Sequence, residues 1–129
     1  FNVYGPRLST SGQYSAVIGN FLSQTKSKKA LTIVGDGKQT RDFIHVDDLA
    51  NAFIKVIKSK LVNKIYNLGS GKSTSINTVA KIFEGKRKHI AIRPGEPRTS
   101  LAKITKLKKD ISWKPKISIQ IGIKKLLGG

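Results

Sequence analysis

The residue types best suited to ligand chemistry in this chain are two arginines and the carboxylates near them. Arg41 follows a Gly-Asp-Gly turn and directly precedes Asp42, while Arg93 opens the sequence Arg-Pro-Gly-Glu that ends at Glu96. A guanidinium group presents a planar fork of N–H donors that fits phosphate oxygens through two parallel hydrogen bonds. A diphosphate would therefore suit two converging arginines better than it would suit lysines. The plainer interpretation of Arg41 is an ordinary ion pair with its neighbour Asp42.

Hydrophobic periodicity predicts the helices and strands that would carry these residues. The clearest element is a helix from Asp47 onward, because its apolar residues recur every three or four positions and acidic residues stand at its start. Its expected apolar face consists of Leu49, Ala52, Phe53, Val56 and Ile57. Other helices are predicted over 14–26, from 73–75 to Gly85, and over 100–109; strands are predicted over 31–34, 64–68 and 89–93, with an extended stretch at 41–46 and a loop at 1–13. The alternation at 117–123 suits a strand or a helix.

The chain is strongly basic, with 25 Lys and Arg against 7 Asp and Glu and a formal net charge of +18. Charge alone would suggest an anionic partner such as nucleic acid. The lysines, however, are scattered through the predicted helices and loops. Most of the few arginines lie in the motif-like segments, at Arg7, Arg41, Arg93 and Arg98. This distribution argues against a nucleic-acid-binding surface and favours a few specific arginine contacts with the phosphates of a ligand.

Length and composition exclude several classes of protein. At 129 residues the chain is long enough for one domain with a core, and it contains no apolar run long enough to span a membrane. With 0 cysteines it has no disulfide framework and no thiolate nucleophile, which is compatible with a cytoplasmic location. Its two histidines, His45 and His89, have no Cys or His cluster around them, so no metal site is predicted.

Three segments together resemble a known family. They are Phe-Asn-Val-Tyr-Gly-Pro-Arg at 1–7, the stretch 35–48 with its Thr-Arg-Asp-Phe, and Arg-Pro-Gly-Glu-Pro-Arg at 93–98. Over nearly its whole length the chain resembles the C-terminal part of an extended short-chain dehydrogenase/reductase, in particular an NAD-dependent nucleotide-sugar epimerase or dehydratase. The resemblance implies an α/β fold in which residues 1–129 form the substrate-binding C-terminal portion of a Rossmann-type protein. It also favours a helix from Ser118 onward.

The resemblance assigns a diphosphate site. It implies that Arg41 and Arg93 contact the diphosphate of a UDP- or dTDP-hexose, that Glu96 accepts hydrogen bonds from ribose hydroxyls, and that Asn2 contacts the diphosphate-sugar. A charge-assisted hydrogen bond to a buried phosphate would contribute roughly 1.5 to 3 kcal/mol. The predicted activity is that of a UDP-hexose 4-epimerase, in which a bound NAD takes and returns the hydride.

The resemblance also implies where the base and the cofactor would lie. Ala16 and Val17 would stand at the start of a helix that covers the base. The backbone of the strand Thr32, Ile33 and Val34 would line the base. Phe1 and Val3 would lie beside the nicotinamide or in the wall of its pocket.

The catalytic half of such an enzyme is absent from the sequence. There is no glycine-rich cofactor turn, and none of Tyr4, Tyr14 and Tyr66 has a lysine four positions further on. No catalytic residue is therefore predicted, NAD would be bound mainly by a missing N-terminal half, and the chain by itself is expected to be inactive. Apolar faces of the helix after Asp47 and of the strand at Tyr66 would be left uncovered, so poor stability or dimerisation is expected.

Several alternatives remain at this level. A 4,6-dehydratase or a decarboxylase of the same family would share these motifs. A small basic nucleic-acid-binding module is the alternative from another class, and a standalone sugar-nucleotide binder is a third. One local departure from the family pattern is Lys103, which stands where many relatives carry an aspartate, so the helix at 100–109 is expected to start about 1 kcal/mol less favourably.

Overall fold

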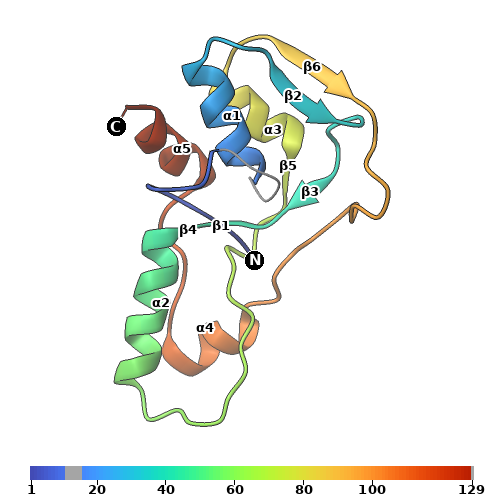
Figure 1. Ribbon diagram of the computed structural model, residues 1–129. Helices are drawn as coiled ribbons and strands as arrows, with labels where there is room; N and C mark the ends of the chain where they lie inside the picture. Colours follow the sequence, from blue (N-terminus) through green and yellow to red (C-terminus); the bar gives the residue numbers. More distant parts are fainter. Residues whose placement is uncertain (11–15, 129) are drawn as a thin grey trace.

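The chain forms an α/β fold, and the computed structural model describes residues 1–10 and 16–128. Its strands associate in pairs (Figure 1). The parallel pairs are β1 (Asn2–Tyr4) with β4 (Phe43–His45) and β2 (Leu31–Val34) with β6 (Arg87–Ile90), and the antiparallel pair is β3 (Thr40–Arg41) with β5 (Thr74–Ser75). The helices are α1 (Val17–Lys26), α2 (Val46–Lys58), α3 (Ile76–Phe83), α4 (Thr105–Ile111) and α5 (Ile119–Gly128).

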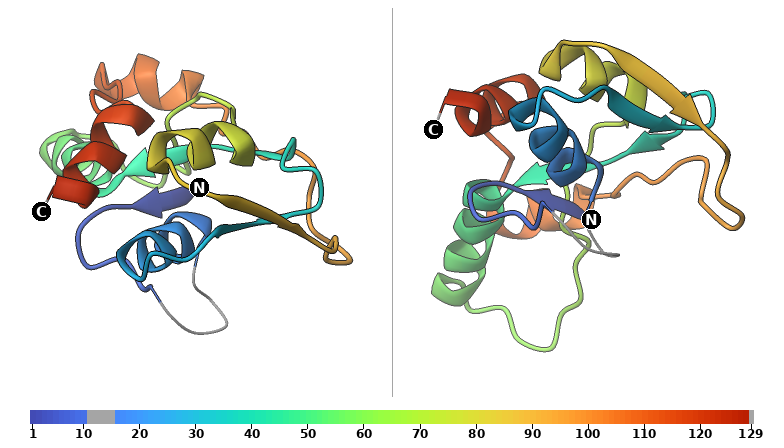
Figure 2. Two further views of the ribbon diagram at one scale, coloured as in Figure 1. Left: turned by 90° about the horizontal axis from the view of Figure 1, so that it is seen from above. Right: turned by 45° about the horizontal axis from the view of Figure 1, so that its top comes forward.

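The hydrophobic core has two parts, which lie on opposite sides of the β1–β4 pair (Figures 1 and 2). In the larger part, α1 and α3 pack against β2 and α5 packs against α3, and Phe21 and Phe83 are in edge-to-face contact. The smaller part lies between α2 and α4 around Trp113, which is only 2% exposed. Each part supplies a rigid support for the loops between strands.

Two buried aspartates, Asp42 just before β4 and Asp48 in the first turn of α2, bind distant segments of the chain. Asp42 is fully buried, and its carboxylate accepts hydrogen bonds from Ser70 N at 2.6 Å, Gly71 N at 2.9 Å and Ala102 N at 3.1 Å. Asp48, 4% exposed, accepts from the backbone N–H groups of residues 116 and 117 at 2.9 and 2.8 Å. The carboxylate of Asp42 is thus used for backbone N–H groups, so the interpretation of Asp42 as the ion-pair partner of Arg41 is wrong.

The Gly-Asp-Gly turn after β2 depends on its glycines. Gly35 and Gly37 have φ of 59° and 69°, a left-handed conformation that residues with a Cβ rarely adopt. A Cβ at Gly37 would also collide with the side chains of Asn77 and Ile33. The turn therefore brings β3 close to the start of α3, where Asn77 Nδ2 donates to Asp36 O at 2.9 Å.

Most of the elements predicted from periodicity are confirmed. The strand at 31–34 is found as predicted, the helices expected around Asp47 and after Ser75 begin at Val46 and Ile76, and the ambiguous stretch after Ser118 is helical. The predicted helix at 14–26 is described from Val17, and the predictions for residues 14 and 15 lie outside the described residues.

Four predictions are wrong in type or extent. The expected loop at 1–13 contains the strand β1, because the β4 backbone pairs with it in parallel. The strand expected at 89–93 lies earlier, at Arg87–Ile90, where β2 offers a partner. The helix expected at 100–109 begins only at Thr105, since Ala102 N is hydrogen-bonded to Asp42 and no side chain caps the helix start. Residues 64–68 form no strand, because a strand needs a series of backbone hydrogen bonds to a neighbouring strand. Here the amino group of Phe1, which donates to Leu68 O at 3.1 Å, is their one backbone partner next to β1.

The helix α2 is apolar on more than the face that packs inward. Ala52 is buried and Leu49 and Val56 pack against the smaller core, whereas Phe53 is 55% and Ile57 78% exposed. The expected uncovered apolar face of this helix is therefore present, with Phe53 and Ile57 on it. Other large apolar side chains exposed nearby in sequence are Ile54, Val62 and Ile65. Every helix within the described ranges is too short or too polar to cross a membrane.

Candidate functional site

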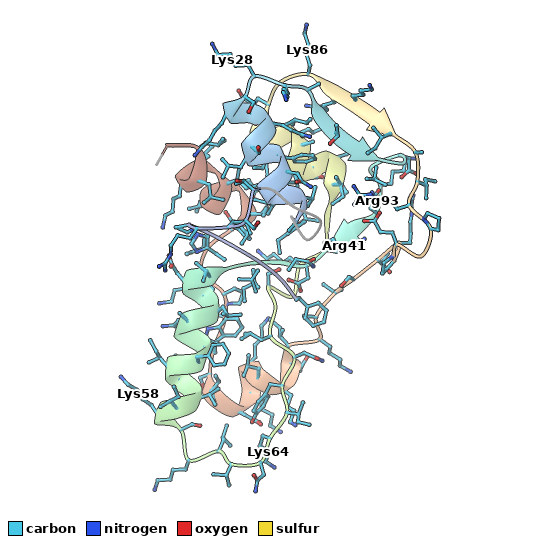
Figure 3. All side chains as sticks on the ribbon, in the orientation of Figure 1. Lys28, Arg41, Lys58, Lys64, Lys86 and Arg93 are labelled. Carbon is cyan, nitrogen blue, oxygen red and sulfur yellow. The ribbon has the colours of Figure 1, made fainter. Side chains whose placement is uncertain are left out.

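A cavity of about 230 Å³ opens between α1, β2, β3 and the loop that follows β6. Of the side chains predicted for substrate binding, it is lined by Asn2, Ala16, Val17, Thr32, Val34, Arg41, Arg93 and Glu96. The fold thus brings together residues from five separate stretches of the sequence. Figure 3 shows Arg41 and Arg93 on the same side of the molecule, away from the labelled lysines Lys28, Lys58, Lys64 and Lys86.

Three predicted site residues lie elsewhere. Ile33 is fully buried in the larger core, and its backbone pairs with β6 rather than facing the cavity. Phe1 and Val3, assigned to the cofactor side, are 47% and 37% exposed and do not line this cavity.

Arg41 is held in a fixed position by its own neighbours. Its Nη1 donates to Thr40 O at 2.8 Å and to Pro97 O at 2.7 Å, and its Nη2 donates to Glu96 Oε1 at 3.1 Å. The Arg41 side chain is only 12% exposed, so this charge-assisted contact is largely shielded from water. By contrast, the Arg93 side chain has no hydrogen bond or ion pair with any residue in the described part of the chain, and its guanidinium is available to an anion.

A second ion pair fastens the same loop from outside. Arg98 Nη1 and Nη2 donate to Asp36 Oδ1 and Oδ2, both at 2.8 Å, in a bidentate arrangement. Hydrogen bonds from Arg98 and from the backbone of Lys38 hold the pKa of Asp36 well below its usual range. Both side chains are exposed, so this is a surface ion pair. Together with the Arg41–Glu96 contact, this pair holds residues 93–98 against the turn after β2.

The strand β2 leaves one backbone acceptor and one backbone donor open on its free edge. Leu31 and Gly35 donate to the β6 side, so the backbone groups of Thr32 and Val34 face the other way. Thr32 N donates to Gln24 Oε1 at 3.0 Å, and Val34 O accepts from Gln39 Nε2 at 2.8 Å. Within residues 1–10 and 16–128, Thr32 O and Val34 N have no partner. This neighbouring acceptor and donor would pair with a planar group that carries an N–H beside a carbonyl.

Sequence reasoning missed several residues that line the cavity, namely Asn20, Gln39, Phe43 and Ile76. Asn20 had a usable signal, because it lies one helical turn after Ala16 and Val17 and so shares their face of α1. Gln39 lies inside the segment that was singled out, but a single glutamine between a turn and a strand has no periodicity to mark its direction.

The described residues do not build a site for NAD. They contain no glycine-rich turn that leads from a strand into a helix to receive a pyrophosphate. Phe1 and Val3 offer only exposed apolar surface. NAD would therefore have to be held by other parts of a longer protein.

Comparison with known proteins agrees with the motifs. The sequence profile of the NAD-dependent epimerase/dehydratase family matches residues 1–69. UDP-glucuronate 4-epimerase of Thermodesulfobacterium geofontis is 36% identical over 97% of this chain and 39% of that protein. UDP-glucuronic acid decarboxylase 2 of Arabidopsis thaliana is 33% identical over 95% of this chain and 28% of that protein.

Solved structures show the same relation. The UDP-glucose 4-epimerase of Thermotoga maritima, solved with UDP-glucose, superposes with a TM-score of 0.91 at 30% identity, over 98% of this chain and 42% of that one. The fold is therefore part of the α/β fold of an extended short-chain dehydrogenase/reductase. The chain belongs to the NAD-dependent epimerase/dehydratase family. It spans about two fifths of the length of the first relatives that it matches.

Proposed function

We propose that this chain binds the nucleoside diphosphate part of a sugar nucleotide, as the C-terminal substrate-binding portion of an NAD-dependent 4-epimerase. The observation that carries the proposal is the cavity that Arg41 shares with Arg93 and Glu96, since Arg41 lies far from both of them in sequence. Two guanidinium groups beside one carboxylate suit a ligand that has both phosphates and hydroxyls. Relatives at 36% identity include a UDP-glucuronate 4-epimerase and a putative UDP-glucose 4-epimerase.

The geometry supports a particular placement of the nucleotide. The diphosphate lies against Arg93, with Arg41 behind it, where the carbonyls of Thr40 and Pro97 keep the Arg41 fork aligned. A pyrimidine imide pairs with Thr32 O and Val34 N at the open edge of β2. Glu96 accepts from the ribose. This chain supplies binding and orientation, and the proton and hydride transfers belong to residues outside it.

The same family supports a second candidate. UDP-glucuronic acid decarboxylases of Arabidopsis thaliana are 30 to 33% identical to this chain, and a 4,6-dehydratase would use the same nucleotide site. The cavity would contact the nucleotide part of the substrate, which is common to the substrates of these enzymes. It would not contact the sugar carbons at which their reactions differ. The sequence of the catalytic half would decide between the candidates.

We also propose that the uncovered face of α2 and the segment 61–68 pack against the cofactor-binding part of a longer protein. Successive N–H groups of β1 point to opposite sides, since Asn2 donates to Asp42 O at 3.0 Å and the Phe1 amino group donates to Leu68 O at 3.1 Å. β1 therefore lies between β4 and the 64–68 segment. Residues preceding Phe1 would extend β1 and give 64–68 the strand partner that it lacks here. A cytoplasmic location and a homodimer remain predictions.

The test is a titration of the protein with UDP by isothermal calorimetry. Arg41→Gln and Arg93→Gln are each expected to weaken binding by about ten- to a hundredfold, since a hydrogen bond to a charged group contributes about 1.5–3 kcal/mol. Arg87→Gln is the matched control, because it removes one exposed positive charge from β6 outside the cavity. If the double variant Arg41→Gln/Arg93→Gln binds UDP as tightly as Arg87→Gln does, the proposed function is wrong.

A further inference from the structure

The strand β6 forms an open edge of the β2–β6 pair (Figure 1). Gly35 N, just after β2, donates to Ile90 O at 2.8 Å, so the backbone groups of Lys88 and Ile90 face β2. In a parallel pair every second residue faces the partner strand, so the N–H and C=O groups of Arg87 and His89 face outward. No described residue pairs with these outward groups. β6 therefore presents free backbone donors and acceptors to a further strand.

The side chains along this edge are exposed and positively charged. Lys86, Arg87 and Lys88 follow one another at the start of the strand, and all three are exposed. Successive side chains of a strand point to opposite faces of the sheet, so Arg87 lies on one face and Lys88 on the other. His89 Nδ1 lies 2.7 Å from Gly35 O, which holds this ring toward β2 and leaves the outer edge uncovered.

The positive charge continues onto the end of α1. Lys28 and Lys29 line a cavity of about 440 Å³ together with Lys86. Figure 3 shows Lys28 and Lys86 at the same end of the molecule, away from the two arginines of the candidate site. We name the β6 edge cluster the five residues Lys28, Lys29, Lys86, Arg87 and Lys88. None of its side chains forms an ion pair with a described residue, so the cluster suits an anionic partner.

Two other occupants fit this edge less well. A second copy of the chain would place the same cations opposite one another, and like charges directly across a sheet are destabilising. Nucleic acid uses phosphate contacts and stacking surfaces and needs no strand edge. The exposed phenylalanines of the described ranges, Phe1 and Phe53, also lie outside α1, β2 and β6. Free backbone groups beside unpaired cations instead match an acidic peptide.

We propose that β6 binds an extended acidic segment of a partner protein, which adds to the free edge as a third strand. Hydrogen bonds to the backbone of Arg87 and His89 supply affinity, and the side chains supply selectivity. Residues opposite one another on paired strands share a face. The segment therefore carries acidic residues opposite Lys86, Arg87 and Lys88 and an apolar residue opposite Ile90. The edge lies outside the cavity of about 230 Å³, so the inference does not depend on the proposed function.

The probe is the peptide acetyl-Thr-Val-Thr-Glu-Glu-Glu-Thr-amide, which places its valine opposite Ile90 in an antiparallel pair. The peptide of reversed order serves a parallel pair. Binding is measured by NMR titration of the isotope-labelled protein. With saturating peptide, hydrogen exchange at the amides of Arg87 and His89 is expected to slow at least about tenfold, since both become hydrogen-bonded. The same peptide with lysine in place of glutamate is expected not to bind.

A first pair of variants tests the charges. Arg87→Gln/Lys88→Gln is expected to bind the acidic peptide about three- to tenfold more weakly, because two exposed ion pairs are lost. Lys58→Gln/Lys60→Gln is the matched control. It removes the same charge from exposed positions at the end of α2 and just after it, and it should bind like the wild type.

A second pair of variants isolates the backbone contact. His89→Ala and His89→Pro both lose the ring contact with Gly35 O, but only proline also removes the outward N–H. An edge strand tolerates proline where the N–H faces solvent. His89→Pro is therefore expected to bind the peptide about three- to tenfold more weakly than His89→Ala, for the loss of one uncharged hydrogen bond. The NMR spectrum reports whether each variant is folded.

Three results would overturn the inference. Peptide binding that leaves the exchange of the Arg87 and His89 amides unchanged would show attraction by charge alone. Protection of these amides in the free protein that rises with protein concentration would assign the edge to a second copy of the chain. Tighter binding of oligouridylate than of the peptide, lost in Arg87→Gln/Lys88→Gln, would assign the cluster to nucleic acid. The proposed function would stand in each case.

Discussion

At the scale of single residues, carboxylates close together in sequence have different tasks. Asp42 and Asp48 accept backbone N–H groups from loops far away in sequence, while Asp36 pairs with Arg98 at the surface. Among the carboxylates in the described ranges, Glu96 is the one that lines the cavity with the arginines. Residue type alone therefore does not distinguish a structural carboxylate from one that meets a ligand.

Tyr4 makes the stability of the fold sensitive to alkaline pH. Burial is the main cause that raises the pKa of Tyr4 from 10.0 to about 12, and the negative charge of Asp48 is the second cause. Because the folded-state pKa is higher than the unfolded one, this contribution is fully present below pH 10 and is lost as the pH rises to about 12. A shift of two pKa units corresponds to about 3 kcal/mol.

Urea unfolding between pH 9 and pH 12 would check this expectation. Tyr4→Phe retains the ring and removes the ionisable group, so its free energy of unfolding should fall less steeply over this range than that of the wild type. Lysine deprotonation is common to both proteins and cancels in the comparison. Parallel pH curves for the two proteins would contradict the assigned pKa.

At the scale of elements, the loops are positioned by hydrogen bonds that cross between them. Asp42, just before β4, holds residues 70–71 and 102, and Asp48, in the first turn of α2, holds residues 116–117. These contacts delay the start of α4 to Thr105, where Ile104 is the cap residue and offers no side-chain acceptor. The expected energetic effect of Lys103 on the helix start stays a prediction.

Asp42→Asn is expected to destabilise the fold by about 3 kcal/mol. The asparagine keeps one acceptor oxygen but turns an NH2 group toward N–H donors that are left unpaired in the interior. Chemical unfolding followed by the fluorescence of Trp113 would measure the change in free energy. Asp36→Asn, at an exposed pair, is the control and should cause a much smaller change; equal effects of the two substitutions would refute the role of Asp42 as an anchor.

At the scale of the whole molecule, the uncovered apolar surface predicts association. Phe53, Ile54, Ile57, Val62 and Ile65 are all at least half exposed. Large exposed apolar patches mark surfaces that bind another protein or another copy of the same chain. The basic surface, with a net charge of +18, opposes self-association at low salt.

Sedimentation velocity over a range of protein concentrations would test this expectation. At physiological salt the wild-type chain is expected to associate, and Phe53→Ser/Ile57→Ser is expected to remain monomeric. Ile121→Ser removes an apolar side chain that is 51% exposed on α5, away from the patch, and should not change the association. A thermally stable wild-type monomer would contradict both the association and the proposed packing partner.

The amino-acid sequence by itself determined the family and much of the secondary structure. Arginine forks at Arg41 and Arg93, the two glycines of the turn and the helical spacing after Asp47 each follow from local chemistry, so they can be recognised without knowledge of the fold. The pattern also indicated β2 with its correct limits.

The tertiary structure alone decided what depends on partners distant in sequence. β1 is a strand because β4 pairs with it, whereas residues 64–68 form no strand because they lack such a partner. Arg41 forms its ion pair with Glu96, while the Asp42 carboxylate accepts hydrogen bonds from other loops. Gln39 was invisible to periodicity, since its significance comes from the carbonyl of Val34 that fixes its amide. Two groups can form a hydrogen bond only when they lie close together in space. Groups that are distant in sequence come close together only after the two parts of the core on either side of the β1–β4 pair have packed.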